Sequence, residues 1–155
     1  MHQRTIWAPA AIRRQFSKFV CIGAAKSGVH KLFAPDKIIA IIDDEPSVLR
    51  SLKRLLTSHH FRTEVFSSGE AFLARPKTDD VACIIADIHL GGMSGIEVGR
   101  RLAARGSTVP IIFMTALDSS AVRREAIEAG CAAYLPKPLA GHDLVGAIEK
   151  ATSLS

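Results

Sequence analysis

The chain has 155 residues, of which 48% are hydrophobic and 23% charged, a size and composition typical of one globular domain. No apolar run approaches the roughly 18–20 residues that cross a bilayer, so the sequence excludes a transmembrane protein and we expect no membrane contact. The three cysteines are too scattered for a disulfide framework or a metal knuckle. This cysteine usage fits a reducing compartment, and we expect a cytoplasmic protein.

Positive charge is concentrated at the N-terminus. The formal net charge is +5, but residues 1–37 hold seven basic side chains and one acidic, whereas the remaining 118 residues hold 13 basic and 14 acidic. The first 36 residues also show no sustained helical or strand period. We therefore expect a basic N-terminal arm over residues 1–36, disordered or loosely packed, and one domain over residues 37–155. A docking arm and a targeting signal stay open as alternatives.

Beyond the arm, short apolar runs alternate with helical patterns. Strands are predicted at residues 38–42, 63–66, 82–86, 109–114 and 132–135. Helices are predicted after each of them, at residues 46–56, 67–75, 96–105, 119–129 and 139–152. Most of these strands are apolar on both faces, as in a parallel sheet covered by helices on each side. Five strand–helix units in a row predict an α/β doubly wound domain with right-handed crossovers.

Polar residues stand at the carboxyl ends of these strands. Asp43 and Asp44 end the first, Asp87 the third, Thr115 the fourth, and Lys137 follows the fifth. Each alone is commonly structural, as a helix cap, a turn former or a surface charge. Because the carboxyl ends of parallel strands meet at one edge of a sheet, we expect all five side chains to converge in one crevice.

Three carboxylates in one crevice repel one another and need a compensating charge to stay ionised. Mg²⁺ prefers a few carboxylates together with waters and a substrate phosphate. A lysine and a threonine hydroxyl across the crevice could hold the oxygens of a phosphoryl group. The set therefore predicts a Mg²⁺-assisted phosphoryl-transfer site with an aspartate as the nucleophile.

Several short motifs surround these residues in a fixed order. They are Ile42-Asp43-Asp44-Glu45, Ala86-Asp87, Met93-Ser94-Gly95, Phe113-Met114-Thr115-Ala116, Ala129-Gly130 and Tyr134-Leu135-Pro136-Lys137-Pro138. With these motifs, the chain from about Lys37 to Thr152 resembles the receiver domain of bacterial two-component response regulators. The resemblance implies a flavodoxin-like five-stranded parallel sheet with strand order 2-1-3-4-5.

The resemblance also implies a role for each acidic residue. Asp87 is the expected phosphoacceptor, taking the phosphoryl group from a histidine kinase or a histidine phosphotransferase. Asp44 is expected to hold Mg²⁺ directly and Asp43 partly through water. Asp87 and the main-chain carbonyl of His89 complete the expected protein ligands. The side chain of His89 is expected to be exposed and to take no part.

The remaining implied roles concern the response to phosphorylation. Thr115 and Lys137 are expected to bind phosphoryl oxygens, and the bond from Lys137 to Pro138 is expected to be cis. Tyr134 is the expected switch residue, swinging inward as Thr115 moves. The face built from the fourth helix, fifth strand and fifth helix would then bind a downstream protein. Such a protein is not an enzyme, since it catalyses only its own phosphorylation and dephosphorylation.

Two residues depart from the pattern of the resemblance. Gly91 stands where receivers usually have proline, so we expect a looser loop after Asp87. Leu117 is a bulky apolar residue beside the presumed path of attacking water, two residues past Thr115. We hypothesise that Leu117 slows hydrolysis of the phosphoaspartate.

Other readings of the chain fit less well. A dehalogenase-type hydrolase needs a second aspartate where His89 stands, and the glycines of Gly91–Gly95 lack the Gly-Lys-Ser/Thr of a P-loop. A receiver-like module that only binds partners stays open, as does a regulator that contacts DNA through the basic arm. The chain ends soon after the last predicted helix, so we expect a stand-alone receiver that binds other proteins or passes its phosphoryl group along a relay. A homodimer is a candidate assembly, and we expect no DNA contact.

Overall fold

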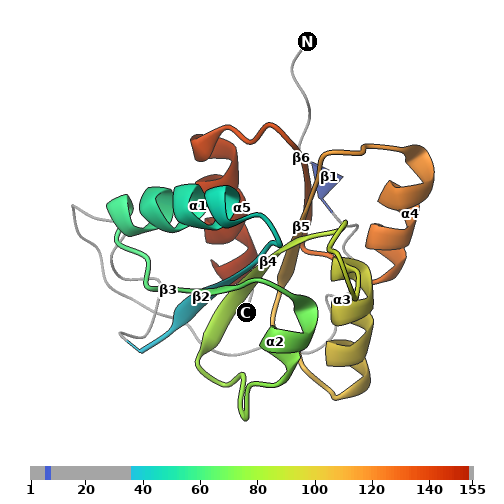
Figure 1. Cartoon of the computed structure of the whole chain (residues 1–155), viewed down its shortest axis with the longest axis horizontal. Coiled ribbons are helices and arrows are strands. Elements are labelled where there is room, and N and C mark those ends of the chain that lie inside the picture. The colour runs from blue at the N-terminus through green and yellow to red at the C-terminus, as the bar shows by residue number, and fades with distance from the viewer. Residues whose placement is uncertain (1–5, 8–35, 154–155) are drawn as a thin grey trace.

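Short apolar strands form the centre of the fold, and amphipathic helices cover both of its faces (Figure 1). The computed structural model describes residues 6–7 and 36–153. The strands are β1 (Ile6–Trp7), β2 (Ile38–Ile42), β3 (Thr63–Phe66), β4 (Val81–Asp87), β5 (Ile111–Thr115) and β6 (Ala133–Pro136). The helices are α1 (Pro46–Ser58), α2 (Gly69–Leu73), α3 (Gly95–Ala104), α4 (Ser120–Glu128) and α5 (Gly141–Ser153). None of the helices within residues 36–153 combines the length and the apolarity needed to span a bilayer.

The sheet has the order β1-β6-β5-β4-β2-β3. Strands β2 to β6 are parallel, and they confirm the predicted doubly wound sheet with the order 2-1-3-4-5, counted over the five expected strands. The sequence did not predict β1, which pairs antiparallel with β6 at the outer edge. Of the arm over residues 1–36, the structure describes only Ile6, Trp7 and Asp36, so the expectation of a disordered or loosely packed arm lies outside the described residues.

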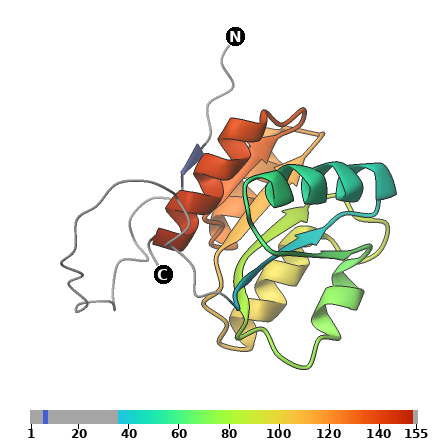
Figure 2. The same ribbon diagram turned by 90° about the vertical axis from the view of Figure 1, so that its left-hand side faces the viewer.

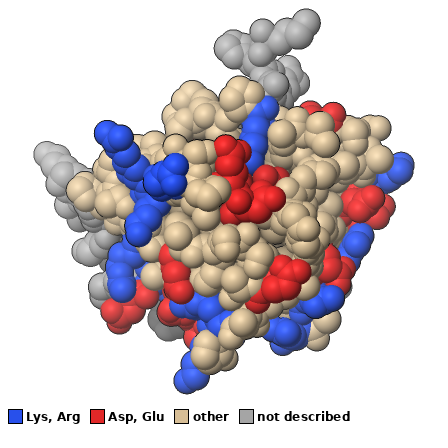
Figure 3. Space-filling view, viewed as in Figure 1, with Lys and Arg blue, Asp and Glu red and all other residues tan. Residues whose placement is uncertain are grey.

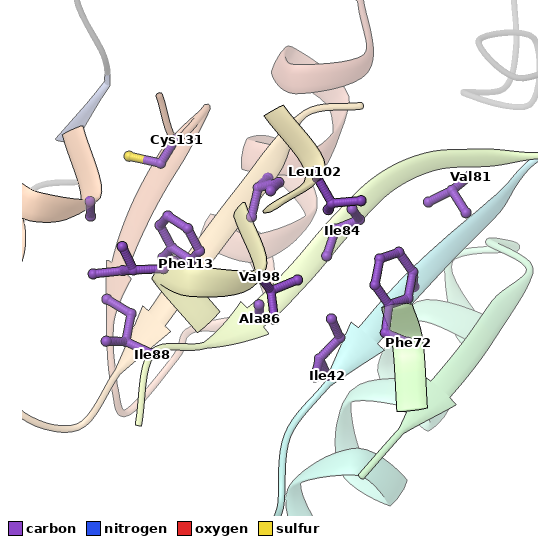
Figure 4. Close-up of a cluster of buried hydrophobic side chains, with 14 of the residues drawn as sticks. Ile42, Phe72, Val81, Ile84, Ala86, Ile88, Val98, Leu102, Phe113 and Cys131 are labelled. Carbon is purple, nitrogen blue, oxygen red and sulfur yellow. The ribbon is translucent and has the colours of Figure 1, made fainter. Parts of the chain in front are cut away.

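β2, β4, β5 and β6 each contribute side chains to two separate cores. Ala40 and Ile42 face a core that α2, α3 and α4 complete, with Phe72 and Val98 fully buried in it (Figure 4). The neighbouring odd-numbered residues of β2 face a second core beneath α1 and α5. Figure 2 shows α1 and α5 together on one side of the sheet. Burial on both faces is why the strands read as unbroken apolar runs.

Serine side chains set the starts of three helices. Ser68, Ser94 and Ser119 each accept a hydrogen bond from a backbone N–H three residues later, which satisfies one of the free donors of the first turn. Ser119 is therefore the N-cap of α4, which begins at Ser120. Pro46 occupies the first turn of α1, as predicted, where a missing N–H costs nothing.

β5 and α5 are among the elements that begin later than predicted. β5 begins at Ile111 and not at residue 109, because Pro110 has no N–H to give to the ladder and contributes only its carbonyl, which accepts from Ile84. α5 begins at Gly141 and not at residue 139, because the carbonyl of Ala140 is the one that receives the first helical hydrogen bonds. Neither difference moves a residue of the expected site.

Candidate functional site

The carboxyl edge of the parallel sheet brings together the five polar residues that the sequence singled out. Asp43, Asp87 and Thr115 are buried, whereas Asp44 is exposed at the rim and Lys137 is half-buried. On the face seen in Figure 1, the space-filling view shows a group of acidic side chains with a basic side chain beside it (Figure 3). Residues up to 94 positions apart in the chain thus share one site.

Lys137 joins the two buried carboxylates. Its Nζ donates to Oδ2 of Asp43 and to Oδ2 of Asp87, both at 2.9 Å. Burial on its own would lower the pKa of Lys137, but these two hydrogen bonds outweigh burial and raise the pKa above its ordinary value. Lys137 is therefore held as a cation between two acids. Its peptide bond to Pro138 is cis, as predicted.

Three carboxylates at this edge are close enough to share one cation. Asp43, Asp44 and Asp87 each offer an oxygen, and the three oxygens lie within 4.8 Å of one another. Lys137 is the one basic side chain bonded to this group among the described residues, so the negative charge is only partly compensated. Oxygen donors of this charge suit Mg²⁺, and the residues present fit that ion.

Backbone N–H groups fix the remaining carboxylate oxygens. The N–H of Glu45 donates to Oδ1 of Asp43 at 2.9 Å, and the N–H of His89 donates to Oδ1 of Asp87 at 3.0 Å. Both aspartates are therefore held in one orientation by the turn that follows their strand. The predicted role of the His89 carbonyl as a metal ligand stays a prediction.

Thr115 is buried, and its hydroxyl bonds within the site. The Oγ1 atom donates to the Leu117 carbonyl at 3.2 Å and accepts from the Leu117 N–H at 3.1 Å. The Oγ1 atom also lies 3.3 Å from Nδ1 of His89, which is an exposed residue. The sequence assigned only a backbone role to His89, and the contact of its ring with Thr115 was missed. Nothing in the local pattern could have shown it, because 26 positions separate the two residues.

Tyr134 already lies inward, fully buried, and two charged residues hold it there. Its hydroxyl donates to Oδ1 of Asp118 at 3.2 Å. Arg123 donates to the other oxygen of Asp118 at 2.6 Å and places its guanidinium 5.6 Å from the centre of the Tyr134 ring. Burial, reinforced by the Asp118 carboxylate, raises the pKa of Tyr134 to about 12. The sequence did not point to Asp118 or Arg123.

The loop after Asp87 is held at two points. The N–H of Met93 donates to Oε1 of Glu70 at 2.9 Å, and the N–H of Gly95 donates to the carbonyl of Ile88 at 3.1 Å. The Glu70 carboxylate accepts hydrogen bonds from its own backbone N–H and from that of Met93, and these bonds lower the pKa of Glu70. At Gly91 a Cβ would fit, at 3.5 Å from Oδ2 of Asp44, so the structure does not require glycine there.

Asp43 offers a test of these electrostatics. Burial raises its pKa above the ordinary value, and the hydrogen bonds from Lys137 and Glu45 oppose this only in part. The folded state thus binds the Asp43 proton more tightly than the unfolded chain does. At pH values above the pKa of Asp43 in the folded state, the ionised carboxylate therefore lowers the free energy of unfolding. This effect vanishes below the ordinary aspartate pKa of about 3.9. We expect Asp43→Asn to raise the free energy of unfolding at pH 7 by on the order of 1 kcal/mol.

The measurement is urea denaturation in metal-free buffer at pH 7 and near pH 4. The gain from Asp43→Asn should shrink at the lower pH, where aspartate in both states approaches the neutral form. Asp79→Asn, at an exposed position, is the matched control and should change little. A loss of stability at pH 7 would contradict the prediction.

Comparison with known proteins agrees with this geometry. A model of the response regulator receiver domain family matches residues 39–149. The response regulator protein TmoT of Ectopseudomonas mendocina is 37% identical over 77% of this chain and 54% of its own length. The crystal structure titled FixJ-N superposes with a TM-score of 0.71 at 31% identity, covering 77% of this chain and 96% of that one.

The fold and the site define a receiver domain of the CheY-like type, and the chain belongs to the response regulator receiver domain family. Receiver domains of this family belong to two-component signalling, and the chain is consistent with a role in a phosphorelay. Receiver domains of this family bind Mg²⁺ at an acidic pocket, which the Asp43, Asp44 and Asp87 cluster matches.

The expectation of no DNA contact is not confirmed. The transcriptional regulatory protein TdiR of Thauera aromatica is 31% identical over 76% of this chain and 52% of its own length. The chain spans about half the length of TdiR and of TmoT. The match therefore does not cover the remaining half of those two proteins.

Proposed function

We propose that Asp87 accepts a phosphoryl group from the phosphohistidine of a histidine kinase or a histidine phosphotransferase. A carboxylate oxygen of Asp87 forms a bond to phosphorus while the phosphorus–nitrogen bond of the donor breaks, and the imidazole leaves and takes up a proton. The observation that supports this best is Lys137, whose Nζ lies 2.9 Å from both Asp87 and Asp43. A fixed cation at this point stabilises the charge that arrives with the phosphoryl group.

Asp43, Asp44 and Asp87 are the residues that would hold Mg²⁺, with the His89 carbonyl as a further ligand. When bound, the ion neutralises charge on the phosphoryl oxygens and orients them for in-line transfer. The side chains around it divide the remaining work. Asp87 supplies the nucleophilic oxygen, and the N–H of His89 keeps its carboxylate oriented through Oδ1.

Thr115 and Lys137 would then bind oxygens of the transferred phosphoryl group. The Thr115 hydroxyl would exchange its bond to the Leu117 carbonyl for one to phosphate. Lys137 would exchange its bond to Asp87 in the same way. Each exchange makes a contact that exists only in the phosphorylated state, which is what a population shift between two states requires. The shift would pass to Tyr134, the proposed switch residue.

The proposed output surface is the face of α4, β6 and α5, and Tyr134 of β6 lies buried behind it. We propose that it binds a downstream protein, and a homodimer is one candidate for that complex. The phosphohistidine donor implies a cytoplasmic protein, and self-phosphorylation and self-dephosphorylation are the only reactions we assign to it. A contact with DNA through the basic residues 1–36 stays a second candidate.

The test is intact mass after incubation with acetyl phosphate, with Mg²⁺ and with a chelator. We expect a gain of one phosphoryl group that needs Mg²⁺ and is absent in Asp87→Asn. Asp79→Asn, at an exposed aspartate away from the edge of the sheet, is the matched control and should be phosphorylated normally. No gain in a folded protein would refute phosphotransfer and favour a module that only binds partners.

Leu117 is expected to slow the loss of the phosphoryl group. Its side chain is 65% exposed beside Thr115, where an apolar group cannot orient an attacking water. We expect Leu117→Asn to hydrolyse the phosphoaspartate about threefold to tenfold faster, a change of up to about 1.4 kcal/mol in the barrier. The decay of the phosphorylated mass with time measures this. Leu117→Met should decay like the wild type, and an unchanged rate in Leu117→Asn would count against the role of Leu117.

A further inference from the structure

The open edge of β6 is covered by two residues from the start of the same chain. β1 pairs antiparallel with β6, so that Ile6 stands opposite Tyr134 and Trp7 opposite Ala133. Figure 1 shows β1 beside β6. The edge of a sheet presents unpaired N–H and C=O groups, which bind any extended segment that can reach them. β1 therefore occupies a strand-docking surface, and it does so next to the proposed switch residue.

The end of β6 is tied to the proposed phosphoryl-acceptor site. Lys137 directly follows the strand, and its Nζ bonds the carboxylates of Asp43 and Asp87. The backbone N–H of Lys137 donates to the carbonyl of Thr115 at 2.7 Å. The position of this end of β6 thus depends on side chains that we propose to rearrange around a phosphoryl group.

A second connection runs through the side chain of Tyr134. Its hydroxyl bonds Asp118, which lies in the loop that follows Thr115. The N–H of Leu117, the residue before Asp118, bonds the Thr115 hydroxyl itself. Movement of Thr115 toward a phosphoryl oxygen would therefore move the loop that holds Tyr134, the residue that faces Ile6 across the ladder.

We propose that β1 is a regulatory strand in cis, docked on β6 while Asp87 is free and released when Asp87 is phosphorylated. The inference rests on the proposed function of Asp87. A ladder of two residues has few hydrogen bonds to lose, so a small change in β6 is enough to displace it. Release would free the edge of β6, and with it the α4–β6–α5 face, for a partner. By linkage, removal of β1 must in turn favour the phosphorylated state.

The chain carries a built-in probe for the docking of β1. Trp7 is its only tryptophan and Tyr134 its only tyrosine, and the two lie in neighbouring registers of the same ladder. Energy transfer from Tyr134 to Trp7 therefore reports docking without a label. It is measured as the tyrosine contribution to the excitation spectrum of the tryptophan emission, in the full chain.

The first comparison is made without any ligand. Ile6→Pro removes an N–H and restricts the backbone of the ladder, so we expect it to lower the energy transfer clearly. Ile6→Val is the matched control and should keep the transfer, because valine is as suited to a strand as isoleucine. If Ile6→Pro transfers energy as well as the wild type, β1 is not docked and the proposal is overturned.

The second comparison adds beryllofluoride, a phosphoryl analogue, together with Mg²⁺. We expect the transfer to fall in the wild type and to stay unchanged in Asp87→Asn. By reciprocity, Ile6→Pro should bind beryllofluoride about fivefold or more tightly than Ile6→Val. If the wild type binds beryllofluoride and the energy transfer does not change or increases, the proposed release of β1 is overturned.

The two proposals can fail separately. If acetyl phosphate adds no mass to Asp87 and beryllofluoride does not bind, both the proposed function and the release of β1 are refuted. If Asp87 is phosphorylated but the transfer does not respond, only the regulatory role of β1 is refuted. Whatever the outcome at Asp87, the comparison of Ile6→Pro with Ile6→Val tests whether β1 is docked on β6.

Discussion

Replacement of Lys137 by alanine is expected to lower the free energy of unfolding at pH 7 by about 2–3 kcal/mol. Lys137 is the shared partner of Asp43, which is fully buried, and of Asp87, whose side chain is 10% exposed. Without the ammonium group, two neighbouring carboxylates stay buried with no opposite charge. The loss is smaller than for a fully enclosed pair, because the side chain of Lys137 is 20% exposed and water reaches the site.

The pH dependence of this loss separates an electrostatic effect from a packing effect. Because its pKa is raised, Lys137 keeps its charge through neutral pH and beyond the ordinary lysine value, so its contribution is present at pH 7. Because burial raises the pKa of Asp43, this carboxyl takes up a proton as the pH falls toward 4, and the loss in Lys137→Ala should become smaller. Urea denaturation in metal-free buffer at both pH values measures this.

Lys53→Ala, at an exposed position of α1, is the matched control and should change stability by less than about 0.5 kcal/mol. A loss in Lys137→Ala no larger than in this control would show that the ion pairs contribute nothing net. If Lys137→Ala loses the same free energy of unfolding at both pH values, the loss comes from packing of the lysine stem and not from its charge.

Gly95→Ala is expected to destabilise the domain by about 2–3 kcal/mol, because overpacking at a rigid point forces the backbone to move. A Cβ at Gly95 would lie 2.3 Å from the backbone carbonyl oxygen of Asp87. No side-chain rotation relieves that contact, since the backbone fixes the position of a Cβ and the other atom is a main-chain oxygen. The displaced residue is the proposed phosphoacceptor, so we also expect phosphorylation by acetyl phosphate to be slower.

The same substitution in another helix provides the control. Gly146 lies in α5, and a Cβ there would meet nothing within 4 Å. Gly146→Ala should raise the free energy of unfolding by about 0.5–1 kcal/mol, because alanine loses less backbone freedom in a helix. Urea denaturation of the two variants should thus show opposite signs. Equal effects would mean that the close approach of Gly95 to Asp87 does not constrain the loop.

The sequence by itself determined the parallel sheet and the residues at its edge. Apolar runs such as residues 38–42 and 82–86 are local patterns, and burial on both faces leaves no other placement for them. Once the strands are parallel, their carboxyl ends meet, and this brings Asp87 to Lys137 without any knowledge of the loops. The convergence was predictable because it follows from topology alone.

Only the tertiary structure decided which side chains support these residues. The bonds of Tyr134 to Asp118 and of Thr115 to His89 join positions on different loops and strands, and neither leaves a periodic signal. β1 could not be predicted either, because two residues are too few to show a strand period. Local patterns determine which residues form the sheet and its edge, whereas contacts between distant segments exist only once the chain has folded.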